Sequence, residues 1–238
     1  FNIRNIYKMK KLLFFLSVML CACHASAQVK VGVEAGANLS HYLVSGSRYA
    51  EHVEDMKVGY QFGVSVDYLM GRHWMLMSGL YLQHTQSKMD LGDGTYKNTF
   101  FKNAEIEVNN LIVPLKLGYQ FNLSDKFSLI PSVGAYASYG FNARKCNLQT
   151  VCQNEQSGDV YIKEATWKPM DGYSHTEGVM AKRLDPFRKW SYGGMAGLKA
   201  VVNDHYTISF DYSVGIKEVQ KQNGLRDSNF QLSVGYRF

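Results

Sequence analysis

Seven ionisable residues lie singly within segments whose other residues are mostly apolar or small. Four are basic and three are acidic, so they could pair with one another, or they could carry protons or ions through a channel. Because an unpaired buried charge is costly, pairing in an enclosed space is the favoured interpretation. We therefore predict a structural charge network inside the protein, formed by Lys30, Glu34, Asp67, Lys116, Lys199, Asp211 and Arg237.

Histidine and cysteine give weaker chemical signals. The histidines do not share a metal-ligand spacing, so we expect no metal and no other cofactor. His41 and His84 could assist a nucleophile in a lipid-modifying enzyme, but the chain has no Gly-x-Ser-x-Gly elbow, and ordinary polar strand ends are favoured. Cys146 and Cys152 form a candidate loop disulfide, because an exported chain meets oxidising conditions; a zinc pair is the weaker alternative.

Residues 1–27 have the pattern of an upstream stretch followed by a secretory signal peptide. Lys10-Lys11 precedes a twelve-residue apolar run, and Ala25-Ser26-Ala27 supplies a small-residue cleavage site. The run is shorter than the roughly 20 residues that a transmembrane helix needs. We expect Met9 to be the true start, and a lipoprotein signal with acylated Cys23 is the weaker alternative. The segment therefore predicts export.

Composition and charge exclude several classes of protein. Hydrophobic residues make up 46% and aromatic residues 13% of the chain, which is too apolar for disorder. Most of the formal charge of +6 belongs to residues 1–27, and the rest of the chain has 22 basic and 20 acidic residues. Without a basic stripe interleaved with aromatic residues, we expect no nucleic-acid partner.

The elements that must position the charged residues are β-strands. In eight segments, apolar residues alternate with polar or small ones, as in strands with one face in lipid and one face toward a lumen. The charged residues fall on the lumen face, and the interior of an eight-stranded cylinder is only wide enough for side chains. We predict an all-β fold for residues 28–238, an eight-stranded antiparallel up-and-down transmembrane β-barrel with strands at 29–40, 58–68, 74–83, 111–120, 127–141, 190–202, 206–216 and 230–238.

Three features favour this barrel over a soluble secreted sandwich. Short turns at 71–72, 122–126 and 203–204 alternate with long loops, as in outer-membrane barrels. Aromatic residues gather near the strand ends, as they do at membrane interfaces. The last strand ends with Tyr236 and Phe238 on the lipid face, the kind of signal that barrel-assembly machinery reads. Closure of the first strand on the eighth then leaves no open edge.

The longest predicted loop, 143–189, is the candidate for external interaction. Loops of this length are usually functional or disordered. Exposed aromatic rings with mixed charges suit a protein, a glycan or the headgroup of lipopolysaccharide. Residues 160–167 could extend the fifth and sixth strands as a hairpin, and a mobile loop held by the two cysteines is the alternative. The candidate contact residues are Tyr161, Trp167, Tyr173, Arg183, Phe187 and Arg188.

Four segments carry a resemblance to a known family. Residues 31–40, 78–82, 111–119 and 235–238, in this order, resemble the small PorT-like outer-membrane β-barrel proteins of Bacteroidetes-type bacteria. The resemblance covers residues 28–238. It implies an eight-stranded barrel in the bacterial outer membrane, often described only as a porin family protein, without catalytic residues. Some relatives take part in a secretion apparatus.

The sequence thus predicts a non-enzymatic outer-membrane barrel with a filled lumen. Its expected role is surface interaction, envelope integrity or an accessory role in a secretion apparatus. The expected partners are outer-membrane lipid and lipopolysaccharide, the barrel-assembly machinery, and an external protein or glycan. A small-solute channel and a lipid A modifying enzyme are the alternative functions.

Overall fold

The computed structural model of the protein describes residues 28–44, 52–92, 99–143, 146–153, 160–168, 173–176, 188–219 and 224–238. The predicted signal segment, with Met9 and Cys23, lies outside these residues. In the described part of the chain, no helix is long and apolar enough to cross a membrane. The strands are β1 (Val29–Val44), β2 (His52–Met70), β3 (Trp74–Gly92), β4 (Thr99–Tyr119), β5 (Phe121–Ser124), β6 (Phe127–Ala143), β7 (Cys146–Gln153), β8 (Val160–Lys168), β9 (Tyr173–Thr176), β10 (Trp190–Val202), β11 (Tyr206–Gly215) and β12 (Leu225–Arg237).

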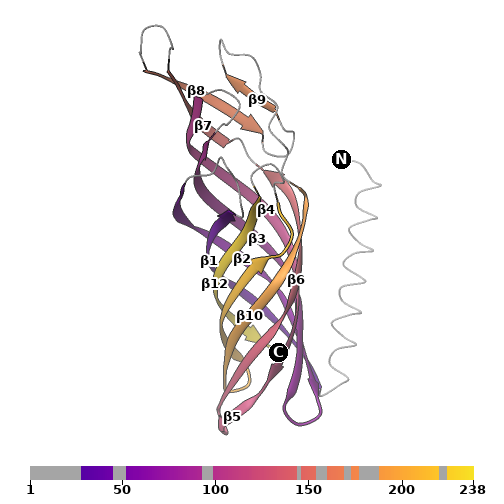
Figure 1. Ribbon diagram of the computed structural model, residues 1–238. Coiled ribbons are helices and arrows are strands. Elements are labelled where there is room, and N and C mark those ends of the chain that lie inside the picture. The colour runs from indigo at the N-terminus through magenta and orange to yellow at the C-terminus, as the bar shows by residue number, and fades with distance from the viewer. Residues whose placement is uncertain are drawn as a thin grey trace, which may run out of the picture.

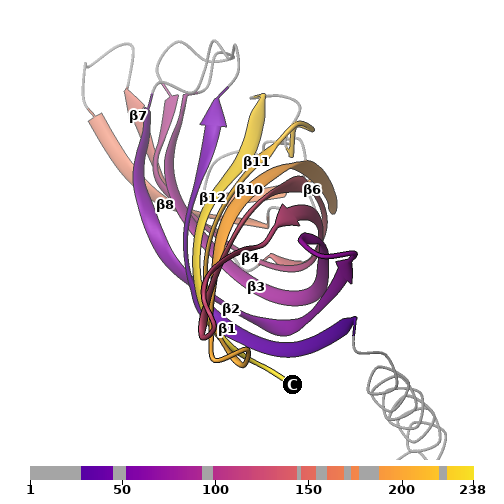
Figure 2. The ribbon, with the colours of Figure 1, turned by 90° about the horizontal axis from the view of Figure 1, so that it is seen from below.

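Eight of these strands close into a barrel (Figures 1 and 2). Around the wall their order is β1, β2, β3, β4, β6, β10, β11 and β12, and β12 pairs with β1 to complete the ring. Each pair of neighbours in the ring is antiparallel. The predicted all-β, eight-stranded antiparallel up-and-down barrel is therefore confirmed. Its closed wall satisfies the backbone polar groups that an open edge would expose to lipid.

The alternating apolar and polar residues of each strand lie on opposite faces of the wall. The outward side chains of Val64, Val133 and Val234 are 44%, 66% and 60% exposed, whereas Ser65 and Gln231, which point inward, are buried. The predicted outward and inward faces are the observed ones along the eight barrel strands. A slip of one residue would bring every apolar side chain into the lumen, so the hydrophobic pattern fixes this register.

Short turns join the strands at one end of the barrel, which we call the turn end; the opposite end is the loop end. Between β10 and β11 the turn residues Asn203 and Asp204 have φ angles of 51° and 61°, the left-handed values that a two-residue hairpin turn requires. Gly71, in the turn between β2 and β3, has a φ of 73°. The turns predicted at 71–72 and 203–204 are confirmed, while the segment 122–126 includes part of β5, which pairs with β6.

Aromatic rings form contacts at both ends of the wall. At the turn end, Trp74 and Tyr119 meet edge to face with 5.3 Å between ring centroids. Toward the loop end, Tyr139 and Trp190 lie 4.9 Å apart. Such amphipathic rings suit the two interfaces between headgroups and hydrocarbon.

At the loop end the wall continues into an open sheet above the barrel (Figure 1). β7 follows β6 along the same edge of β4, pairing with residues 99–105 of that strand, and β8 and β9 add to its other side. We call β7, β8, β9 and residues 99–105 the protruding sheet. Residues 160–167 therefore form the returning strand of a hairpin that extends the fifth barrel strand, β6, as predicted. The sixth barrel strand, β10, takes no part in it, and a loop without structure is the wrong interpretation of the described part.

The backbone of β7 corrects the prediction of a disulfide between Cys146 and Cys152. Both residues lie in this one strand, opposite Trp167 and Tyr161 of β8. Six residues of extended strand separate two Cα atoms by about 20 Å, whereas a disulfide requires less than about 7 Å. The two cysteines of one chain therefore cannot pair in this fold.

Candidate functional site

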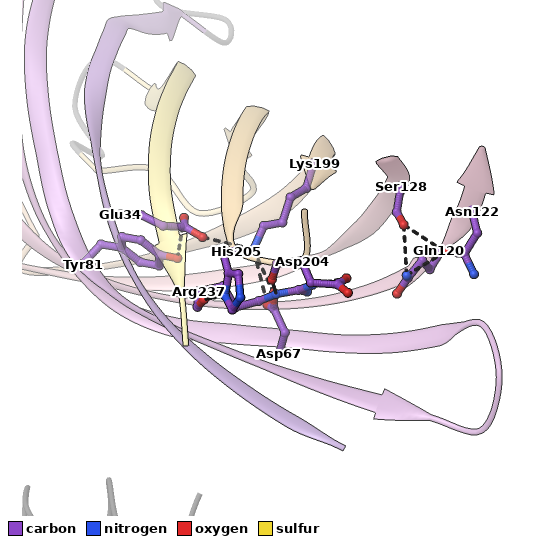
Figure 3. Close-up of polar contacts among 10 residues, drawn as sticks. All are labelled: Glu34, Asp67, Tyr81, Gln120, Asn122, Ser128, Lys199, Asp204, His205 and Arg237. Carbon is purple, nitrogen blue, oxygen red and sulfur yellow. Dashed lines mark hydrogen bonds and ion pairs between the residues drawn. The ribbon is translucent and has the colours of Figure 1, made fainter. Parts of the chain in front are cut away.

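The lumen holds the predicted charge network, and Lys199 is at its centre (Figure 3). Its Nζ lies 3.1 Å from Glu34 Oε1 and 3.2 Å from Asp67 Oδ2, and the three side chains are buried. Lys199 belongs to β10 and Asp67 to β2, which are four strands apart in either direction around the ring of eight. This ion pair therefore spans the lumen from one wall to the opposite wall.

Two further side chains contact the carboxylates of Glu34 and Asp67. Tyr81 on β3 donates a hydrogen bond of 3.0 Å to Glu34 Oε2. The guanidinium of Arg237, on β12, lies 3.9 Å from Asp67 Oδ2, and its Nε donates to the backbone oxygen of Asp204 at 3.1 Å. Two cations thus balance two anions among buried side chains, the arrangement in which buried charges are tolerated.

A second buried ion pair lies nearby. Lys116 Nζ, on β4, is 2.6 Å from Asp211 Oδ1 on β11. Lys30 is different: it is half-buried near the turn end, and within the described residues it forms no ion pair, although it stands opposite Asp67 in the β1 and β2 register. The structure therefore brings six of the seven predicted residues into ion pairs and leaves Lys30 apart.

Apolar side chains fill the space beside these charges. Met75, Met77, Ile130 and Val201 form a buried cluster next to the network, and Ile112, Tyr136 and Met195 form a second cluster. Small cavities of about 20 Å³ and about 50 Å³ lie between the described residues of the lumen. A water molecule needs roughly 10 to 15 Å³ by this measure, so each holds at most a few waters. The filled interior is the one expected of eight strands.

The loop-end half of the lumen contains a polar group that the sequence analysis missed. Asp227 Oδ2 accepts a hydrogen bond of 2.5 Å from Tyr136, and Oδ1 accepts one of 2.8 Å from Ser191. Buried amides continue the network: Asn229 donates to Gln83 at 3.1 Å, and Gln83 donates to Gln61 at 3.0 Å. Asp227 lies before residue 230, where the sequence analysis placed the start of the last strand. Gln61 and Gln83 stand at inward positions of predicted strands, and that alternation could have found them, whereas Asn229 lies just before the predicted last strand.

Comparison with known proteins defines the family. The family model of the outer membrane protein beta-barrel domain matches residues 13–238. The chain belongs to this family. It is a protein of the bacterial outer membrane, and its long loops are those that outer-membrane barrels extend outside the cell. The loop end is therefore the external end and the turn end the periplasmic one.

Several solved outer-membrane barrels are similar to this family member. Ail, the attachment invasion locus protein of Yersinia pestis, shares 13% identity over 89% of this chain and 99% of that chain, with a TM-score of 0.38. Neisserial surface protein A shares 13% over 87% and 97%, with a TM-score of 0.43. OprG from Pseudomonas aeruginosa shares 14% over 89% and 96%, with a TM-score of 0.44. No curated protein sequence matches the chain significantly.

The candidate external residues of this outer-membrane barrel do not share one strand. Tyr161 and Trp167 belong to β8, and Tyr173 begins β9. Arg188 is exposed just before β10, and its backbone nitrogen donates to Val219 at 2.8 Å. Arg183 and Phe187 lie outside the described residues.

The two histidines considered for catalysis have different surroundings. His84 Nδ1 lies 2.8 Å from Asn109 Oδ1, and its Nε2 lies 3.0 Å from Gln86 Nε2. His41 Nδ1 is buried and has no hydrogen-bond partner among the described residues. Within the same part of the chain, no group of three His, Cys, Asp or Glu side chains could hold a metal ion. Neither histidine is thus joined to a serine, threonine or cysteine nucleophile in the described structure.

The final strand places both predicted assembly residues in the periplasmic aromatic belt. Tyr236 and Phe238 point outward, and their rings meet edge to face at 5.3 Å. Tyr236 also contacts Tyr206 at 5.6 Å. The backbone nitrogen of Phe238 donates to Val31 at 2.8 Å, which ties the end of the chain to β1 across the closing seam.

Proposed function

We propose that the protein is a non-enzymatic, non-conducting barrel that anchors the protruding sheet for contact with a protein or glycan outside the cell. The observation that carries this proposal is the pairing of β4 with β7 beyond the end of its pairing with β6. Backbone pairing holds the sheet on the barrel wall, so its position is fixed by the fold. A segment whose backbone is already paired loses less conformational entropy on binding than a free loop.

The filled lumen supports an anchor rather than a small-solute channel. The contact of Lys199 with Asp67 crosses the full width of the barrel, and opening it would leave Glu34 buried without its cation and Asp67 with Arg237 alone, at 3.9 Å. An enzyme that modifies lipid A would need an activated nucleophile, and neither His41 nor His84 has one as a partner in the described residues.

The finer assignments are part of the same proposal. We propose that the protein belongs to the PorT-like proteins of Bacteroidetes-type bacteria and that the protruding sheet serves surface interaction, envelope integrity or a secretion apparatus. We also propose that Tyr236 and Phe238 are read by the barrel-assembly machinery. Their outward rings at the closing seam suit that role.

Photo-crosslinking on intact cells tests the proposal. A photoreactive amino acid at Tyr161, in β8, is expected to form discrete adducts with an external protein or glycan. The matched control is Val133, which is 66% exposed on the lipid face of β6 and should give lipid adducts only. If the adducts at Tyr161 are the same as those at Val133, the proposed surface role is wrong.

A further inference from the structure

The external cavity of the lumen, of about 50 Å³, contains a carboxylate that no cation balances. Asp227, on β12, accepts a hydrogen bond through each of its oxygens, from Tyr136 and from Ser191, which fits an ionised carboxylate. Both donors are neutral hydroxyls. Within the described residues Asp227 forms no ion pair, whereas each carboxylate of the charge network contacts a lysine. Because an enclosed carboxylate is stabilised by a cation, Asp227 offers its charge to a ligand.

A second oxygen of this cavity is an acceptor without a donor. Asn229 lies at the next inward position of β12, lines the same cavity and is only 6% exposed. Its Nδ2 donates to Gln83 on β3, so Oδ1 is the free end of the amide. Within the described residues this Oδ1 is buried and has no hydrogen-bond partner. A buried acceptor without a partner is costly, so Asn229 favours a ligand that brings a donor.

An ammonium group fits these two neighbouring residues. It carries a positive charge for Asp227 and several N–H donors, one of which Asn229 Oδ1 can accept. Divalent metal ions usually take more charged ligands than a single carboxylate supplies. Within the described part of the chain, no group of three His, Cys, Asp or Glu side chains could hold a metal ion. The floor of the cavity therefore suits an amine.

Two cations stand at the mouth of the cavity. Arg188 and Lys189 are exposed just before β10, and both line the cavity. Their backbones are held at the external end, because Arg188 N donates to Val219 at 2.8 Å and the carbonyl of Lys189 accepts from Gly140 at 2.7 Å. Within the described residues neither side chain forms an ion pair. The mouth therefore attracts an anionic group and repels a ligand that is only a cation.

The two charged regions are close enough for one small molecule. Lys189 lies two residues before Ser191, whose hydroxyl donates to Asp227. Two residues of extended chain separate the Cα atoms by about 7 Å, and the flexible lysine side chain can shorten the distance to a bound anion. A ligand with an ammonium group at one end and a carboxylate at the other matches this order of charges.

The cavity limits the size of the ligand and closes below it. A water-sized group needs roughly 10 to 15 Å³, so about 50 Å³ has room for only a few such groups. Ile112 lines both this cavity and the one of about 20 Å³ beside Glu34, and it forms a buried cluster with Tyr136 and Met195. This cluster separates the two cavities. A ligand therefore enters and leaves at the external end.

We propose that the external cavity binds a small zwitterion of the amino acid class, with its ammonium group on Asp227 and Asn229 and its carboxylate toward Lys189 and Arg188. Glycine has both charges and the required size. Its net charge is zero, so neither the mouth nor the floor opposes its entry. This binding site goes beyond the proposed surface role and does not depend on the partner of the protruding sheet.

Isothermal titration calorimetry of glycine with the purified full-length protein in detergent micelles tests the site. A ligand this small binds no tighter than about micromolar, so a high protein concentration is needed. Asp227→Asn keeps the shape of the side chain but removes its charge, and we expect it to raise the Kd about tenfold or more. Asp125→Asn is the matched control, because Asp125 is exposed in the periplasmic turn before β6, and its Kd should stay that of the unchanged protein.

A second pair of variants keeps the test valid if Asp227→Asn does not fold. Ser138→Leu fills the cavity from β6, and we expect no detectable binding of glycine. Ala137→Leu places the same side chain on the lipid face of the same strand, where Ala137 is exposed, and should bind glycine normally. Heat-modifiable migration in gels checks that each variant is folded.

Glycinamide, which keeps the ammonium group but has a neutral amide in place of the carboxylate, tests the mouth. The unchanged protein should prefer glycine over glycinamide, and Lys189→Gln combined with Arg188→Gln should lose this preference. Three results would overturn the proposal. They are equal Kd values for glycine in Asp227→Asn and Asp125→Asn, equal Kd values for glycine and glycinamide in the unchanged protein, and tighter binding of glycine by Lys189→Gln, which would make Lys189 itself the cation of Asp227.

Discussion

The two halves of the lumen satisfy their polar groups in different ways. In the periplasmic half, Lys199 meets both Glu34 and Asp67 at the centre of a balanced set of charges. In the external half, Asn229 Oδ1 and His41 Nδ1 have no partner among the described residues, and both side chains line the cavity of about 50 Å³. The periplasmic half has only a cavity of about 20 Å³ beside Glu34 and Tyr81, whereas the larger cavity of the external half has more room for water at its polar groups. Loss of the same kind of hydrogen bond should therefore lower the unfolding free energy more in the periplasmic half than in the external half.

The largest effect is expected for Lys199→Met. This change leaves Glu34 and Asp67 buried without their common cation, and breaking a buried ion pair in this way costs about 3 to 5 kcal/mol. Urea unfolding of the protein in lipid vesicles measures the loss of unfolding free energy.

A triple variant separates charge from packing in that result. Lys199→Met combined with Glu34→Gln and Asp67→Asn removes the uncompensated charges and should recover most of the lost stability. If the triple variant is as unstable as Lys199→Met alone, the stability of the periplasmic half does not depend on charge balance.

A smaller effect is expected for Tyr81→Phe in the same half. The change removes the hydrogen bond to Glu34 Oε2, and a bond to a charged group in an enclosed site contributes about 1.5 to 3 kcal/mol. Glu34 keeps its contact with Lys199, so the loss should be below that of Lys199→Met. The same unfolding measurement applies.

The matched substitution in the external half is Tyr136→Phe. It removes the hydrogen bond to Asp227 Oδ2, but both residues line the external cavity of about 50 Å³, which has more room for a replacing water than the cavity of about 20 Å³ beside Tyr81 and Glu34. We expect a loss of about 1 kcal/mol, smaller than that of Tyr81→Phe. An equal or larger loss for Tyr136→Phe would break the comparison between the two halves.

The smallest effect is expected above the barrel, at the cysteines. Because Cys146 and Cys152 lie along one strand, we expect a reducing agent to change neither the unfolding free energy nor the migration of the unfolded chain. Thiol labelling of the denatured, unreduced protein should modify both residues. A reducible crosslink between these two positions would show that β7 is not extended as described.

The sequence predicts the barrel well because its signal is periodic and applies to every strand. Alternation decides which face of the wall each residue occupies. A slip of register is unfavourable because it would place the polar side chains in lipid. The same alternation places Lys199, Asp67 and Asp211 in the lumen. Left-handed turn residues such as Asn203 and Asp204 are also visible as local signals.

Contacts between distant strands could not be predicted in this way. Periodicity gives the face of Lys199 but not its height relative to Asp67, which depends on how the strands are staggered around the ring. Asp227 was missed because its segment, at the end of a strand, has no clear alternation. The disulfide prediction failed because spacing alone does not show whether the chain between two cysteines turns back or continues as a strand.

Ion conductance across a planar lipid bilayer tests the filled lumen most directly. With the full-length protein inserted, we expect no steady conductance above that of the bare bilayer, because the contact of Lys199 with Glu34 and Asp67 closes the barrel across its width. A steady current that rises in steps as protein is added would contradict a closed lumen and would favour the small-solute channel.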